Sequence, residues 1–233
     1  MHKILQYQQW HALALIILLA VICFYAKSDA TFFSGSLWGI CTLNWYLLAL
    51  SIPILHQIYV LIIWRSELHF GSISKLLGKN GFKIYKIVFA TFMFSRITTI
   101  VILSYSSSMT MNLNPTISYI LSGIFFIPAG YLFYSVAKYF GIDKAVGIDH
   151  FHPEKAKNEP FVNQGIFRYT SNGMYKYGVL ALWIPGVLLQ SKAALSLALF
   201  SHLYIWVHYY FTELPDIKII YGNNKNQLQN YNT

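Results

Sequence analysis

Six long apolar stretches run through this 233-residue chain and limit the folds open to it. A helix needs about 20 apolar residues to cross the hydrocarbon core of a bilayer. Inside lipid the backbone must satisfy its own hydrogen bonds, which favours helices. Charged residues make up only 11% of the chain, against roughly 25% in soluble proteins. We therefore predict an all-α, polytopic integral membrane bundle of about six hydrophobic helices. The stretches are 10–26, 37–64, 84–105, 117–140, 177–189 and 193–211.

Two of these stretches leave their structure open. Stretch 37–64 is 28 residues long and contains Pro53, so it forms either one kinked, tilted helix or two shorter pieces. Stretch 177–189 has 13 residues and contains Pro185. It either borrows residues 174–176 to reach across the bilayer or lies partly at the interface. Only three residues separate it from stretch 193–211, so we expect the last two helices to form an antiparallel hairpin.

Two polar motifs flank this hairpin. The first, Gly-Ile-Phe-Arg-Tyr-Thr-Ser-Asn-Gly-Met-Tyr, occupies 165–175, and the second, Glu-Leu-Pro-Asp-Ile-Lys-Ile-Ile-Tyr, occupies 213–221. Because the two helices between them are expected to run antiparallel, both motifs should arrive at the same membrane face. The sequence therefore predicts a site there that is open both to water and to lipid.

The net charge of +9 comes mainly from basic residues in alternate polar segments, around 65–86 and 138–176, while segment 106–116 carries no charge. Short loops rich in Lys and Arg stay in the cytoplasm. We therefore expect a multi-pass protein with both termini and the active site on the cytoplasmic side. The excess charge then indicates contact with anionic lipid heads rather than with nucleic acid.

We treat 1–233 as a single membrane domain with three parts. Residues 1–116 hold the N-terminal spans, 117–222 a core that carries both motifs, and 223–233 an Asn- and Gln-rich tail that we expect to be flexible. The longest polar segment, 141–172, mixes charges with aromatic residues. That composition favours a small folded cytoplasmic cap over a disordered linker.

The first motif resembles sequences of two groups of integral-membrane methyltransferases. Asn172 begins an Asn-Gly-Met-Tyr element that is similar to the Asn-Pro-Met-Tyr of phosphatidylethanolamine N-methyltransferases. Isoprenylcysteine carboxyl methyltransferases usually have Arg-His-Pro where this chain has Ser171, Asn172 and Gly173. The resemblance is therefore stronger to the phospholipid enzymes.

The second motif resembles the same family. The phospholipid enzymes carry Glu-Glu-Pro and then a tyrosine six residues after the proline. Glu213, Pro215 and Tyr221 match that spacing, while Leu214 replaces the second acid. Gly130 is similar to the second glycine of a Gly-x-Gly that precedes the cap in those enzymes. The resemblance covers roughly 123–221.

Such a resemblance implies S-adenosyl-L-methionine as cofactor and a membrane lipid as acceptor. A carboxylate would bind the α-ammonium of the cofactor, donors its carboxylate, and aromatic rings its adenine and sulfonium methyl. The cofactor-binding residues that we predict are Glu213, Arg168, Asn172, Tyr175, Tyr221 and Gly130. The catalytic residues that we predict are Asp216 and Tyr175.

The amine of an ethanolamine phospholipid is the preferred acceptor. A lipid ammonium has a Lys-like pKa near ~10 and must lose a proton before it attacks. Asp216 is the nearest acid to Glu213 and would take that proton. One alternative is carboxyl O-methylation of the isoprenylcysteine type. Another is a non-catalytic membrane protein or small-solute carrier, which would not bind the cofactor.

A metal site is a further reading of the cap. His150 and His152, with Asp149, could ligate zinc or iron. No third or fourth ligand lies at a motif spacing, so we predict no metal.

Overall fold

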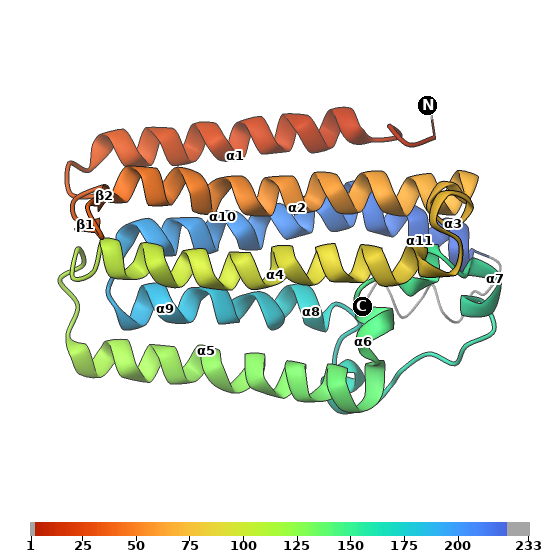
Figure 1. Ribbon diagram of the computed structural model, residues 1–233. Helices are drawn as coiled ribbons and strands as arrows, with labels where there is room; N and C mark the ends of the chain where they lie inside the picture. Colours follow the sequence, from red (N-terminus) through yellow and green to blue (C-terminus); the bar gives the residue numbers. More distant parts are fainter. Residues whose placement is uncertain (1–2, 223–233) are drawn as a thin grey trace.

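Long antiparallel helices run the length of the molecule in the computed structural model, which describes residues 3–222 (Figure 1). Within these residues four helical segments are long and apolar enough to cross a membrane: Gln8–Ser28, Thr42–Phe70, Ser72–Ser106 and Pro115–Phe140. The all-α membrane bundle is therefore confirmed. The flexible tail expected at 223–233 lies outside the described residues.

Eleven α-helices occur in the described part of the chain. They are α1 (Gln8–Ser28), α2 (Thr42–Phe70), α3 (Ser72–Leu77), α4 (Gly81–Ser106), α5 (Pro115–Ser135), α6 (Ile142–Ala145), α7 (Pro153–Ala156), α8 (Gly173–Lys176), α9 (Trp183–Leu188), α10 (Lys192–His208) and α11 (Leu214–Tyr221). Two π-helical segments, Val136–Phe140 and Tyr209–Glu213, extend α5 and α10. Short 3-10 turns occupy Gly78–Asn80, Ile148–His150, Gly165–Arg168 and Gly178–Leu182. Strands β1 (Ser36–Leu37) and β2 (Ile40–Cys41) pair antiparallel before α2.

The second apolar stretch forms one helix rather than two. Helix α2 runs unbroken for 29 residues with Pro53 inside it. It ends where Gly71 takes a left-handed conformation and donates its N–H to the carbonyl of Glu67 at 2.7 Å.

The last hairpin begins with a segmented helix. Helix α8 at the end of the first motif, the 3-10 turn Gly178–Leu182 and α9 follow one another beside α5 (Figure 1). Pro185 lies inside α9, where it supplies no N–H to the helix. At the turn, Ser191 caps α10 by accepting the N–H of Ala194 at 3.1 Å.

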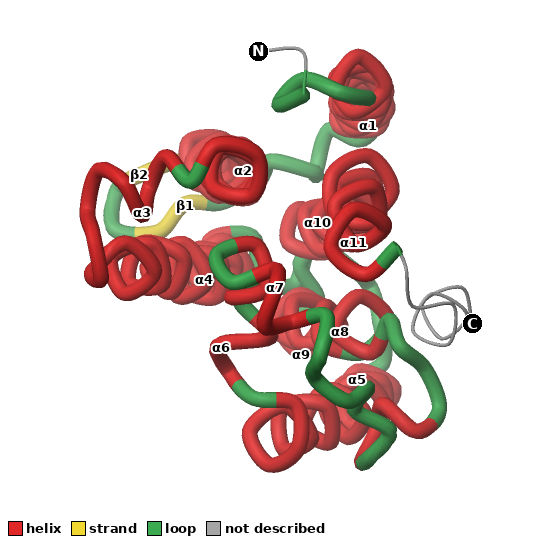
Figure 2. Tube along the Cα trace, turned by 90° about the vertical axis from the view of Figure 1, so that its right-hand side faces the viewer, coloured by secondary structure: helices red, strands yellow, loops and turns green. Residues whose placement is uncertain are grey.

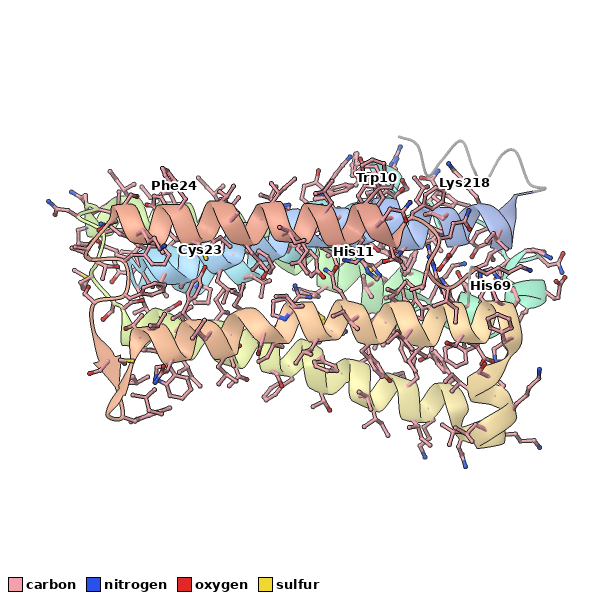
Figure 3. All side chains as sticks on the ribbon, turned by 90° about the horizontal axis from the view of Figure 1, so that it is seen from above. Trp10, His11, Cys23, Phe24, His69 and Lys218 are labelled. Carbon is pink, nitrogen blue, oxygen red and sulfur yellow. The ribbon has the colours of Figure 1, made fainter. Side chains whose placement is uncertain are left out.

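Helix α10 lies at the centre of the bundle, against α1, α2, α4 and α9 (Figure 2). Buried side chains such as Tyr46, Leu103 and Leu197 form the core between these helices. Helix α1 covers one edge: His11 points inward and meets the hydroxyl of Tyr204 at 3.1 Å, while Phe24 points outward (Figure 3). Apolar side chains on the outer faces are those that would meet lipid.

The two ends of the bundle differ. One end, called the polar end below, carries α3, α6, α7 and α11 (Figure 1). The other, called the far end, carries the β-hairpin and the two short connections 107–114 and 189–191. Both polar motifs lie at the polar end, because one precedes the hairpin and the other follows it.

Candidate active site

A cavity at the polar end is lined by residues from both motifs and from the cap. It contains four of the residues predicted from the sequence: Asn172, Tyr175, Glu213 and Tyr221. These four come from positions 38 to 49 residues apart on either side of the hairpin. The remaining lining residues are Trp64, Phe140, Lys144, Ala145, Gly147, Asp149, His150, Phe161, Val162, Phe167, Ser171, Met174, Tyr209, Ile217 and Ile220.

Glu213 and Tyr175 meet directly in this cavity. Glu213 is the last residue of the second π-helical segment, and the Tyr175 hydroxyl, from α8, donates a hydrogen bond to its carboxylate. Burial raises the pKa of Glu213 to about 7, although the bond from Tyr175 opposes that rise. The carboxylate therefore gains and loses its proton close to neutral pH.

A second carboxylate of the cavity belongs to Asp149. The hydroxyl of Tyr221, from α11, donates to it and joins the second motif to the cap. Asn172 is buried beside these groups, and its N–H is bonded to the hydroxyl of Thr170 at 3.2 Å. The sequence had suggested Asp149 only as a metal ligand, so its place in the cavity is new.

The cap lies directly on the indole ring of Trp64. Gly147 has φ +89°, and a Cβ at this position would overlap the Trp64 ring. His150 stacks on the same ring, with centroids 4.0 Å apart and planes at 18°. The Trp64 indole N–H donates to the Tyr85 hydroxyl at 2.7 Å, and that hydroxyl donates to the Val146 carbonyl at 2.9 Å. Trp64 thus orients the cap segment that carries Asp149 and His150.

The first motif is anchored to α5 by its opening glycine. Gly165 has φ +60° and lies so close to Ser135 that a side chain would collide with it. The Ser135 hydroxyl accepts the N–H of Ile166 at 3.0 Å. This anchor fixes where the motif turns toward the cavity.

Asp216 differs from the free base that the sequence suggested. It is 1% exposed, does not line the cavity, and forms an ion pair with Nε of Arg65 at 3.2 Å. Its other oxygen lies 3.6 Å from Nε2 of His150, which does line the cavity.

Arg65 is buried and bonded to several segments of the chain, whereas the sequence indicated a basic residue in a polar loop. Its Nη1 donates to the carbonyls of Ile4 and Gln6 at 2.9 and 2.6 Å. Its Nη2 donates to the carbonyls of Phe211 and Thr212 at 3.0 and 3.4 Å.

The carbonyl of Phe211 needs an outside donor for a simple reason. In an α-helix it would accept the N–H four residues later, but that residue is Pro215, which has none. Arg65 and the side-chain amide of Gln8, at 2.9 Å, supply donors instead. The proline of the second motif therefore has a structural partner on α2.

Two predicted residues do not line the cavity. Arg168 is exposed and lines a neighbouring pocket that shares Phe161, Phe167 and Ser171 with the cavity. Gly130 is on the exposed face of α5, and a Cβ there would meet nothing within 4 Å. Their predicted roles in cofactor binding stay predictions.

The histidine pair of the cap is split. His150 is buried under the cavity, whereas His152 is exposed. In the described part of the chain, no three or more His, Cys, Asp or Glu side chains are grouped so as to hold a metal ion.

No sequence motif marked Trp64, and Asp149 and His150 were suggested only as metal ligands. Trp64 and its neighbour Arg65 were visible only as an aromatic and a basic residue at the end of an apolar stretch. Such a pair is ordinary at a membrane interface, so it did not identify a site.

Comparison with known families returns a match for the C-terminal part of the chain. Residues 117–224 match the family described as phospholipid methyltransferase. The matched region holds α5, the cap, both polar motifs and the last hairpin, while Trp64 and Arg65 lie before it. Neither the curated proteins nor the solved structures give a match.

Proposed function

We propose that this membrane methyltransferase, whose residues 117–224 match the phospholipid methyltransferase family, acts on the amine of an ethanolamine phospholipid. S-adenosyl-L-methionine would be the donor. The cavity at the polar end supports this proposal most directly, because residues of both motifs surround two carboxylates there. Four helical segments are long and apolar enough to cross a membrane, and a lipid acceptor would be found in that membrane.

The chemistry of the lining residues fits a sulfonium cofactor. Glu213 would hold the α-ammonium of the cofactor. Asn172 would donate to the cofactor's carboxylate, together with the buried Ser171 hydroxyl, which has no hydrogen-bond partner among the described residues. Asp149 would accept from ribose hydroxyls. Tyrosine rings line the remaining wall and suit a cationic methyl group. When bound, the cofactor supplies an electrophilic methyl group, and the protein supplies position and charge.

The charges around the cavity favour an amine over a carboxylate acceptor. Asp149 and Glu213 line it together with one lysine, Lys144. A carboxylate acceptor would meet like charges, whereas an ammonium would be attracted. Lys144, whose Nζ lies 3.3 Å from the Glu159 carboxylate, would bind the lipid phosphate.

Cofactor binding to the detergent-purified protein tests the proposal first. Titration calorimetry should give saturable binding of S-adenosylmethionine. With phosphatidylethanolamine as the added acceptor, label from the methyl group should then appear in its N-methylated products. With phosphatidylcholine as the added acceptor no label should be transferred, because its nitrogen is already fully methylated.

The possible failures are distinct. A folded protein that binds no S-adenosylmethionine would refute the proposal. Transfer of label to a prenylated cysteine, with none to phosphatidylethanolamine, would assign the carboxyl reaction instead.

A further inference from the structure

His150 lines the cavity, and neither of its ring nitrogens forms a hydrogen bond with any of the residues that the structure describes. Its side chain is 4% exposed and is held against the Trp64 ring. A buried polar atom without a hydrogen-bond partner destabilises the fold. Nδ1 of this imidazole, which has no partner among the described residues, therefore points to a polar group that enters the cavity.

A line of charged groups stands behind this imidazole. Nε2 of His150 lies 3.6 Å from one Asp216 oxygen, and the other Asp216 oxygen accepts from Arg65 at 3.2 Å. Arg65 is itself fixed by four backbone carbonyls. Because Arg65 holds it, the Asp216 carboxylate does not turn into the cavity. It can orient the His150 imidazole and stabilise the positive charge of the protonated ring.

The other acids near the cavity already have assignments. Glu213 accepts from Tyr175 and would hold the cofactor, and Asp149 accepts from Tyr221. Asp216 is turned toward Arg65 and does not line the cavity. His150 is the base that remains among the described lining residues.

We infer that His150 is the general base of the reaction, and that Asp216 and Arg65 are positioning residues for it. The inference rests on the proposed function, because a lipid ammonium must lose a proton before its nitrogen can attack. The N–H bond of the ammonium breaks, and its electron pair stays on nitrogen as the nucleophilic lone pair. The proton passes to Nδ1 of a neutral His150, while Nε2–H faces Asp216. The resulting imidazolium later releases the proton to water at the polar end.

The groups that face His150 set the direction of its response to pH. Helix α2 contributes Arg65 and Trp64, and the cap contributes Asp149 and Lys144. The C-terminal elements contribute His208 from α10, Glu213 from the π-helical segment and Asp216 from α11. Among the acids of this set, Asp216 forms the ion pair with Nε2 of His150, at 3.6 Å. Removing the Asp216 charge should therefore make His150 easier to deprotonate.

A measurement without cofactor tests the pairing. Proton NMR of protein labelled with ¹³C at histidine Cε1 should show one resonance that titrates and that is absent from His150→Gln. Asp216→Asn should move its midpoint to lower pH by at least half a unit. A His150 resonance that does not titrate between pH 5 and 8, or that is unmoved in Asp216→Asn, would refute the pairing.

Kinetics test the role in the reaction. His150→Gln should lower kcat for phosphatidylethanolamine by about 10²- to 10⁴-fold, the usual range for a general base. The affinity for S-adenosylmethionine should change less than threefold, which also reports that the variant is folded. The matched control is His152→Gln, an exposed histidine two residues away, which should keep full activity.

The pH dependence of kcat distinguishes a general base from a residue with a purely structural role. Wild-type kcat should rise with pH through the NMR midpoint and then level off, and Asp216→Asn should shift this limb to lower pH. Equal kcat for wild type and His150→Gln would overturn the inference while leaving the methyltransferase proposal intact. If the wild-type protein binds the cofactor but does not methylate ethanolamine lipid, both the assigned acceptor and the inference about His150 are refuted.

Discussion

At the scale of single residues, the bond between Tyr175 and Glu213 joins the two polar motifs. We expect Glu213→Gln to weaken S-adenosylmethionine binding about 10- to 100-fold, since a charge-assisted hydrogen bond contributes roughly 1.5–3 kcal/mol. Because burial raises the Glu213 pKa to about 7, wild-type affinity should increase as pH rises from 6 to 8. The affinity of the variant should not respond to pH in this way.

Titration calorimetry at several pH values makes that comparison. Glu154→Gln is the matched control, because Glu154 is an exposed glutamate of α7. Affinity of Glu213→Gln equal to that of wild type at pH 8 would remove Glu213 from the cofactor site.

Gly147 allows a second prediction at this scale. Gly147→Ala should lower stability and cofactor affinity, because its Cβ would overlap Trp64 and push the cap off the indole. Gly71→Ala is the control: Gly71 is also left-handed, with φ +60°, but a Cβ there would lie no closer than 3.7 Å to the Lys75 side chain. Both variants bear the left-handed strain of about 1–2 kcal/mol, and only Gly147→Ala adds the collision. Equal melting temperatures for the two variants would contradict this account.

At the scale of elements, the second π-helical segment depends on α2. Arg65 replaces the donor that Pro215 lacks and also neutralises Asp216. Arg65→Met would leave the Asp216 charge buried without a partner and should destabilise the fold by about 3–5 kcal/mol. Arg65→Lys should fall between Met and wild type, because lysine keeps the charge but not the fork of donors.

Thermal unfolding in detergent measures these differences. The control is Lys86→Met, which breaks the exposed Lys86–Asp143 pair and should cost at most about 1 kcal/mol. A melting temperature for Arg65→Met no lower than that of Lys86→Met would mean that the buried pair does not stabilise the segment.

Most elements could be predicted from the sequence, because a membrane helix is recognised by the length of one continuous apolar stretch. The choice between one helix and two around Pro53 could not be predicted, since a proline inside a helix is compatible with either outcome. Arg65 was misjudged because its partners lie at positions 4, 6, 211, 212 and 216, far away in the chain.

The site was predictable only where motifs marked it. Asn172, Tyr175, Glu213 and Tyr221 do line one cavity. Gly130 was chosen by its similarity to a motif, but the rotation of α5 about its axis turns it outward. His150 was missed as a cavity residue because only its position on Trp64, 86 residues earlier, reveals it.

At the scale of the whole molecule, we predict the membrane orientation from the difference between the polar end, which carries the basic segments, and the far end. Cysteines at positions 75 and 155 should react only with reagents on the cytoplasmic side, and a cysteine at 110 only from outside. Native Cys41, exposed in β2 at the far end, should behave like position 110 once Cys23 is replaced by serine. Accessibility labelling of intact cells and inverted vesicles checks this. Labelling of position 155 from outside would reverse the orientation.

The placement of the cavity at one end has a consequence for the membrane itself. Under the proposed function, an acceptor headgroup would reach it from the monolayer that borders the polar end. Methylation under the proposed function would therefore change the composition of that monolayer first. The opposite monolayer would gain product only as fast as lipids flip between the two. A cell using this protein would thus create lipid asymmetry as a direct product of the reaction.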